Sequence, residues 1–190
     1  MFKSLFVIAL PIILQNLMQS TVNMLDTLMV GQLGSVEIAS VGLGNQIYML
    51  LNMVLFGISS GGAIFIAQFW GKKENSGIWK MEGVMFSFSI VIALIFTFAS
   101  VFFPKFLIGL YSKDFHVIEI GARYLRIVAF SFPFFAMSFA FSMALRSTEH
   151  VKLPMVATMI SLVLNAILNY LLIFGIGFFP SLGIVGAAIA

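Results

Sequence analysis

The sequence contains no cysteine, which excludes disulfides, thiolate metal sites and cysteine nucleophiles. Its two histidines, His116 and His150, lie within two residues of a charged residue in predicted loops, and no HExxH or GxxxxGKS/T motif occurs. Few residues are therefore suited to enzyme chemistry. We expect neither an enzyme activity nor a bound metal or cofactor.

Charge is also scarce. Only 9% of the 190 residues are charged and 61% are hydrophobic, with a mean hydropathy of +1.11. A soluble domain carries roughly 25% charged residues. No basic stretch is interleaved with aromatic residues, so nucleic acid is excluded as an expected partner. The composition instead predicts an integral membrane protein in contact with the lipid bilayer.

The first apolar run, Leu5–Val30, superficially resembles a signal peptide because it follows a lysine at position 3. It is much longer than the apolar core of a typical signal peptide, which has about 7–15 residues, and no small-residue cleavage site interrupts it. We therefore interpret it as a retained transmembrane helix.

Charges and glycines divide the chain into apolar runs long enough to span a membrane as helices. The runs lack the alternation of barrel strands, so an all-α, polytopic helical bundle is expected. Five complete helices are followed by the start of a sixth, which suggests the N-terminal part of a longer protein. The expected ranges are 5–30, 42–69, 83–103, 124–145 and 153–174, with the sixth from 183 onward.

The distribution of lysine and arginine predicts the orientation. One side of the membrane would hold Lys3, Lys72, Lys73, Lys80, Arg146 and Lys152, and the other would hold Lys105, Lys113, Arg123 and Arg126. Six positive charges against four favour a cytoplasmic N-terminus in a multi-pass plasma (inner) membrane protein.

Asp26 is the only acidic residue within the five expected spans. A charged residue at the centre of a membrane helix costs roughly 2.5–3.5 kcal/mol on insertion scales. At ~100° per residue, Asp26 shares an arc of about 80° with Gln15, Gln19 and Asn23. Such a stripe predicts a helix face that lines a polar cavity, and Pro11 near the same face would permit a kink. The alternative is an acid at the helix end that reaches the membrane surface.

The expected fifth helix repeats this pattern, because Thr158, Ser161, Asn165 and Asn169 also lie within an arc of about 80°. These side chains would either line the cavity with Asp26 or only hold helices together. Hydrogen bonds that only hold membrane helices together contribute roughly 0.6–2 kcal/mol each. With Asp26 available as a partner, a functional role is the better interpretation.

Several separated motifs resemble the multidrug and toxic compound extrusion (MATE) family. Pro11 and Asp26 occupy the first helix, and four further segments follow in family order. These segments are MVGQLGSVEIASVGLGNQI, GISSGGAIFIAQFWGKKE, ALRSTEHVKLPMVATMISLVLNAILNYLLIFGIG and PSLGIVGAAIA.

The resemblance implies one six-helix bundle of a twelve-helix secondary antiporter, with the C-terminal bundle as the missing partner. It implies export of cationic or amphipathic compounds in exchange for protons or sodium ions. Asp26 matches the family's coupling aspartate, and Asn165 and Asn169 match polar positions near it. The position of Asn169 is an aspartate in some members, so its neutral side chain here favours protons over sodium ions.

Two other functions are compatible with the sequence. A flippase for lipid-linked saccharides would need basic residues for a pyrophosphate headgroup, and none is expected on the cavity faces. A membrane assembly subunit that does not transport would instead use its polar stripes to bind a partner helix.

Overall fold

The structure, a computed structural model, describes the backbone of residues 2–175 and 180–190 and the side chains of residues 13–175 and 180–190. All regular elements in these ranges are helices, as expected from the sequence. Their bounds are α1 Phe2–Gly31, α2 Ser35–Gly71, α3 Asn75–Phe102, α4 Pro104–Gly109, α5 Phe115–Val128, the 3₁₀ turn η1 Ala129–Ser131, α6 Phe132–Ser147, α7 Lys152–Phe174 and α8 Ile184–Ile189.

Four helical segments in the described residues are long and apolar enough to cross a membrane: α2, α3, the α5–η1–α6 unit and α7. α1 has 30 residues, but the side chains of its first turns lie outside the described part. α8 is the start of the expected sixth helix. The all-helical membrane architecture predicted from composition is therefore confirmed.

The helices extend further than their uncharged runs. The second begins at Ser35 rather than 42, the third at Asn75 rather than 83, and the fourth segment at Phe115 rather than 124. Hydropathy marks only the part of a helix suited to hydrocarbon, whereas backbone hydrogen bonding continues into charged flanking turns. At the start of α5, Oδ1 of Asp114 accepts hydrogen bonds from the backbone N–H groups of His116 and Val117.

The expected fourth helix is interrupted at η1 because Pro133 has no N–H group to donate to the carbonyl of Ala129. That carbonyl instead accepts a hydrogen bond from the N–H of Phe132. The hydroxyl of Thr97 on α3 also lies 3.1 Å from it and shares its hydrogen with the Ala93 carbonyl of its own helix, at 2.8 Å. A side chain from a neighbouring helix thus contributes to satisfying the backbone group that proline leaves free.

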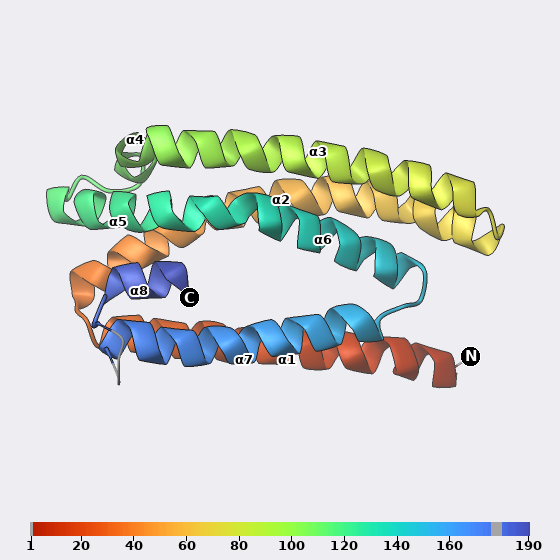
Figure 1. Ribbon diagram of the computed structural model, residues 1–190, viewed down its shortest axis with the longest axis horizontal. Helices are drawn as coiled ribbons and strands as arrows, with labels where there is room; N and C mark the ends of the chain where they lie inside the picture. Colours follow the sequence, from red (N-terminus) through yellow and green to blue (C-terminus); the bar gives the residue numbers. More distant parts are fainter. Residues whose placement is uncertain (1, 176–179) are drawn as a thin grey trace.

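The helices form two groups (Figure 1). α1 and α7 lie side by side as parallel neighbours, while α2, α3, α5 and α6 pack together in a second group. The N-terminus of α1 and the α2–α3 and α6–α7 turns lie at one end of the bundle, which we call the N-terminal end. α8 lies between the groups at the opposite end, where it contacts α5 and α7.

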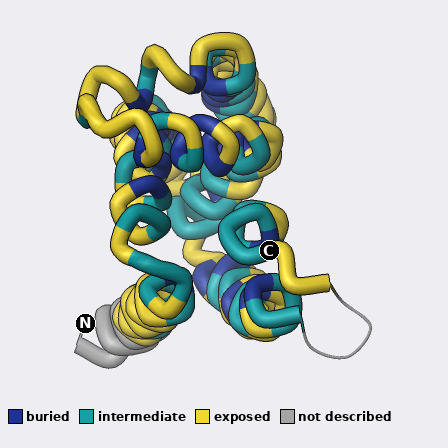
Figure 2. Tube along the Cα trace, turned by 90° about the vertical axis from the view of Figure 1, so that its left-hand side faces the viewer, coloured by how far each residue is buried: buried dark blue, intermediate teal, exposed yellow. Residues whose placement is uncertain are grey.

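The main core belongs to the larger group, where buried positions concentrate along facing helices (Figure 2). Alanines allow close packing: Ala93 of α3 and Ala136 of α6 are fully buried beside Leu51 and Leu55 of α2. Large apolar side chains such as Met53 and Phe88 are more than 60% exposed, as expected for surfaces that face lipid.

Candidate functional site

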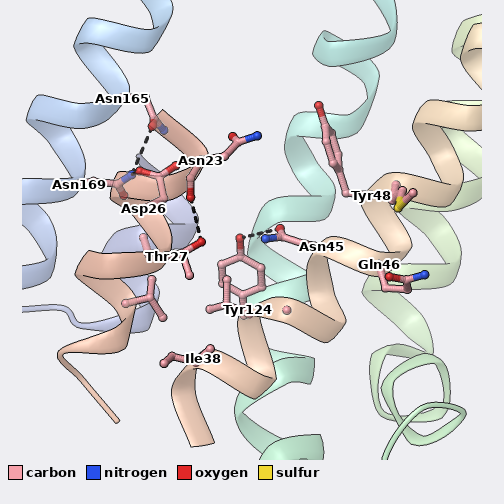
Figure 3. Close-up of a pocket in the computed structure, with 15 residues that line it drawn as sticks. Asn23, Asp26, Thr27, Ile38, Asn45, Gln46, Tyr48, Tyr124, Asn165 and Asn169 are labelled. Atoms are coloured by element: carbon pink, nitrogen blue, oxygen red, sulfur yellow. Dashed lines mark hydrogen bonds between the residues drawn. The ribbon is translucent and has the colours of Figure 1, made fainter. Parts of the chain in front are cut away.

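A cavity of about 490 Å³ lies between the two helix groups. Its lining combines the C-terminal halves of α1, α5 and α7 with the N-terminal half of α2 and with α8 (Figure 3). Asp26 is the only charged residue in this lining. The residues are Asn23, Asp26, Thr27, Val30, Ile38, Val41, Gly42, Asn45, Gln46, Tyr48, Met49, Tyr124, Asn165, Asn169 and Ala187.

Asp26 is joined to α7 through Asn169. The Nδ2 group of Asn169 donates a 2.7 Å hydrogen bond to Oδ1 of Asp26 and a 3.3 Å hydrogen bond to Oδ1 of Asn165 (Figure 3). The Asn169 side chain is buried, whereas Asp26 is only partly so. A neutral amide therefore supplies the hydrogen bond to the carboxylate, and the three predicted coupling residues lie together.

The carbonyl oxygen of the Asn169 side chain has no hydrogen-bond partner among the described residues, although it is buried. A buried acceptor without a donor costs about 1–3 kcal/mol. Such an oxygen beside a carboxylate suits a proton donor, a water molecule or a cation. The site can thus attract positive charge with two kinds of oxygen.

Further along the stripe on α1, the side chains bond mainly to their own helix. Gln19 donates to Oδ1 of Asn23 at 3.2 Å, and the Thr27 hydroxyl donates to the Asn23 backbone carbonyl at 2.8 Å. Asn23 and Thr27 line the cavity, whereas Gln19 is exposed outside its lining.

The opposite wall contains Tyr124 of α5, whose hydroxyl donates to Oδ1 of Asn45 on α2 at 3.3 Å (Figure 3). Gly44 makes this packing possible, since a Cβ there would lie 2.6 Å from the Tyr124 ring. The tyrosine is 8% exposed and presents its polar edge to the cavity. Its hydroxyl and the Asn45 amide add polar groups to a lining that also contains apolar side chains such as Ile38 and Met49.

Other predicted cavity residues lie elsewhere. Gln15 and Thr158 are joined by a 2.6 Å hydrogen bond between α1 and α7, outside the cavity lining. Ser161 is exposed and is likewise absent from the lining. Periodicity groups residues by helix face but does not give the depth at which that face meets a cavity. Pro11 lies within the continuous helix α1, and its side chain is outside the described residues.

Arg146 requires a correction. The expected fourth helix ended at 145, leaving this residue in a loop, but α6 continues through Arg146 to Ser147. Its Nη2 group donates a 2.7 Å hydrogen bond to Oε1 of Gln15 on α1. A cation therefore reaches between the helix groups, although it does not line the cavity.

Five further residues line the cavity although the sequence predicted no role for them: Thr27, Asn45, Gln46, Tyr48 and Tyr124. Asn45 and Gln46 were visible as amides within an apolar run, which is the signal that could have found them. Tyrosine is common at membrane boundaries, so Tyr124 gave no comparable signal.

Residues 57–61, GISSG, have the GxSxG form of a hydrolase nucleophile motif. Ser59 is fully buried within α2, whereas a nucleophilic serine of that kind stands on an exposed strand-to-helix turn. Within the described residues, no three histidines or acidic residues cluster as a metal site. The chemistry available in the cavity is that of one carboxylate, its amide partners and two tyrosines.

Comparison with known proteins agrees with this architecture. The MatE family model matches residues 11–171. The chain is 30% identical over 190 residues to the probable multidrug resistance protein YoeA of Bacillus subtilis (strain 168), covering 100% of this chain and 41% of that protein. It is also 30% identical over 189 residues to the probable multidrug resistance protein NorM of Thermotoga maritima, covering 99% and 40%.

Solved structures share the fold. A crystal structure of MATE in complex with MaD3S matches with a TM-score of 0.88 at 21% identity, covering 98% of this chain and 41% of that one. An outward-facing multidrug resistance MATE transporter matches with a TM-score of 0.87 at 22% identity, covering 98% and 40%. The chain thus spans about two fifths of these relatives. Helices of membrane length and this family match together show a multi-pass membrane protein, and the chain belongs to the MatE family of transporters.

Proposed function

We propose that this chain forms the ion-coupling half of a secondary antiporter that exports cationic or amphipathic drugs in exchange for protons. The observation that carries the proposal is the position of Asp26. It is the only charged group lining a cavity of about 490 Å³, and Asn169 holds its carboxylate from the neighbouring helix. The names of the multidrug resistance relatives support the class of cargo.

The coupling follows from competition for one negative charge. Ionised Asp26 attracts a cationic drug electrostatically within a site of low polarity. Protonated Asp26 has no net charge and loses that attraction. Proton and drug therefore exclude each other, which is the thermodynamic requirement for exchange.

Protons suit this site better than sodium ions. Hard metal cations prefer several oxygen ligands, often with more than one carboxylate. Here Asp26 supplies the only carboxylate in the lining, and the Asn165 oxygen already accepts a bond from Asn169, which leaves the Asn169 carbonyl as a neutral oxygen beside the carboxylate. A single carboxylate is sufficient for a proton.

The negative lining also disfavours a flippase for pyrophosphate-linked saccharides. Such a headgroup would be repelled by Asp26, and Arg146 lies outside the cavity lining.

For the orientation, we propose a cytoplasmic N-terminus in the cell membrane. The α2–α3 turn with Lys72 and Lys73 and the α6–α7 turn next to Lys152 lie at the N-terminal end of the bundle, as positive-inside topology requires.

The test is drug export by the full-length protein in proteoliposomes with an imposed proton gradient or an imposed sodium gradient. We expect the proton gradient to drive export and Asp26→Asn to abolish it. Glu119→Gln is the matched control, because Glu119 is exposed on α5 outside the cavity. Undiminished proton-driven export by Asp26→Asn would refute the proposed coupling role.

A further inference from the structure

Three side chains from three helices form a polar bridge away from the cavity. Nη2 of Arg146 on α6 donates to Oε1 of Gln15 on α1 at 2.7 Å. Nε2 of the same glutamine donates to the hydroxyl of Thr158 on α7 at 2.6 Å. The bridge therefore connects the α1–α7 pair to the larger helix group.

Gln15 suits this position because its amide has an acceptor and a donor on opposite branches. The Gln15 side chain is only 9% exposed, whereas the nearby side chains of Leu14 and Leu17 on the same helix are exposed. Both branches are used, one toward each helix group. An apolar residue of similar size would break both contacts at once.

The bridge lies at the N-terminal end of the bundle, where it joins α1 to the last turn of α6. Among the described residues, α1 packs against α7, and α2 against α3, far more closely than α6 packs against α7. Arg146 belongs to the last turn of α6, near the N-terminal end of the bundle. The guanidinium makes this a charge-assisted hydrogen bond, a class roughly twice as strong as hydrogen bonds between neutral groups.

The same bridge is in register with the proposed coupling site. Gln15 and Thr158 are 143 residues apart, and so are Asp26 and Asn169. The two pairs are therefore equivalent rungs between parallel helices, separated by about three helical turns. A shift of α1 along α7 would break both rungs together.

We propose that Arg146 and Gln15 form a latch that holds the N-terminal half of α1 against α6 and keeps the two helix groups together at this end. Separating the groups would leave the partly buried guanidinium without its Gln15 acceptor, which is unfavourable. The latch therefore favours an engaged state over a released one. A role in the transport cycle rests on the proposed function, but the latch itself does not.

The experiment measures the distance between the two helix groups by double electron–electron resonance spectroscopy on the spin-labelled full-length protein in nanodiscs. Spin labels replace Leu17 on α1 and Phe88 on α3, two exposed positions, in a background without other cysteines. We expect one narrow distance distribution for the otherwise unsubstituted protein. Arg146→Gln should raise the population of a longer distance several-fold.

Two further variants separate the latch from general loosening. Gln15→Ala removes the acceptor and should give the same longer distance, so it decides the question if Arg146→Gln does not fold. Thr158→Val removes only the rung to α7 and should leave the α1–α3 distance unchanged. Unchanged distributions in folded Arg146→Gln or Gln15→Ala would overturn the proposal, as would an equal change in Thr158→Val. None of these distance measurements depends on transport. Failure of the latch proposal can therefore be distinguished from failure of the antiporter proposal.

Discussion

Asn169 of α7 and Asp26 of α1 are joined by a 2.7 Å hydrogen bond across 143 residues of sequence, with the amide as donor and the carboxylate as acceptor. This pair places a neutral, buried partner beside the only charge in the cavity lining. The bond is available only while α1 and α7 keep their present register. The state of the carboxylate and the packing of the two helices are therefore linked.

Replacing Asn169 by aspartate places a second carboxylate beside the first. Two carboxylates close together repel each other and are stabilised by a shared cation. We expect Asn169→Asp to gain sodium-stimulated drug export, measured in proteoliposomes with sodium gradients. Asn23→Asp adds an acid elsewhere in the lining and serves as the control. Strong sodium stimulation of the unsubstituted protein would contradict the account.

Replacing Asn169 by leucine tests the hydrogen bond itself. The substitution keeps a similar volume but leaves Oδ1 of Asp26 without its donor, which costs about 1–3 kcal/mol when the acceptor is buried. Because Asp26 is partly exposed, the lower end of this range applies. We expect a lower thermal midpoint in detergent and weaker drug binding. Equal stability and binding would show that the bond contributes little.

Gly44 and Gly42 form a matched pair on α2. A Cβ at Gly44 would lie 2.6 Å from the Tyr124 ring, whereas a Cβ at Gly42 meets nothing within 4 Å. Gly44→Ala should lower stability by roughly 1–3 kcal/mol through overpacking. Gly42→Ala should be neutral or slightly stabilising, because alanine favours helix by up to about 1 kcal/mol. Thermal unfolding of both variants in one detergent is the measurement, and equal midpoints would contradict the packing described for Tyr124.

Thr97 is expected to stabilise the break between α5 and α6. Its hydroxyl lies 2.8 Å from the Ala93 carbonyl of its own helix and 3.1 Å from the Ala129 carbonyl, the group that Pro133 leaves without its usual donor. Thr97→Val should destabilise the protein by about 1 kcal/mol. Thr21→Val is the control, because Thr21 is exposed and bonds only to Leu17 of its own helix. A similar loss of stability in both variants would assign the effect to the hydroxyl in general.

The sequence predicted the membrane class, the helical fold and the grouping of Asp26 with Asn165 and Asn169. These follow from hydropathy, helical periodicity and family resemblance, which are local or inherited signals. The contacts of Tyr124 and Arg146 were not predictable in this way. Tyr124 meets Asn45 across 79 residues and Arg146 meets Gln15 across 131, so tertiary packing decides which residues they touch.

Helix ends and the break at η1 were also missed. Hydropathy reports the solvent that a residue prefers, whereas a helix continues as long as its backbone groups find partners. The proline at 133 was visible, but the contact of Thr97 from another helix with the freed Ala129 carbonyl was not. Sequence periodicity carries no information on such a partner.

Proton release on drug binding tests the central claim most directly. A cationic drug is added to the purified full-length protein in weak buffer, at a pH where Asp26 is partly protonated, and the change in pH is measured. The account predicts that drug binding releases protons and that Asp26→Asn removes this release while Glu119→Gln retains it. Drug binding without proton release, or equal release from Asp26→Asn, would contradict competition at Asp26.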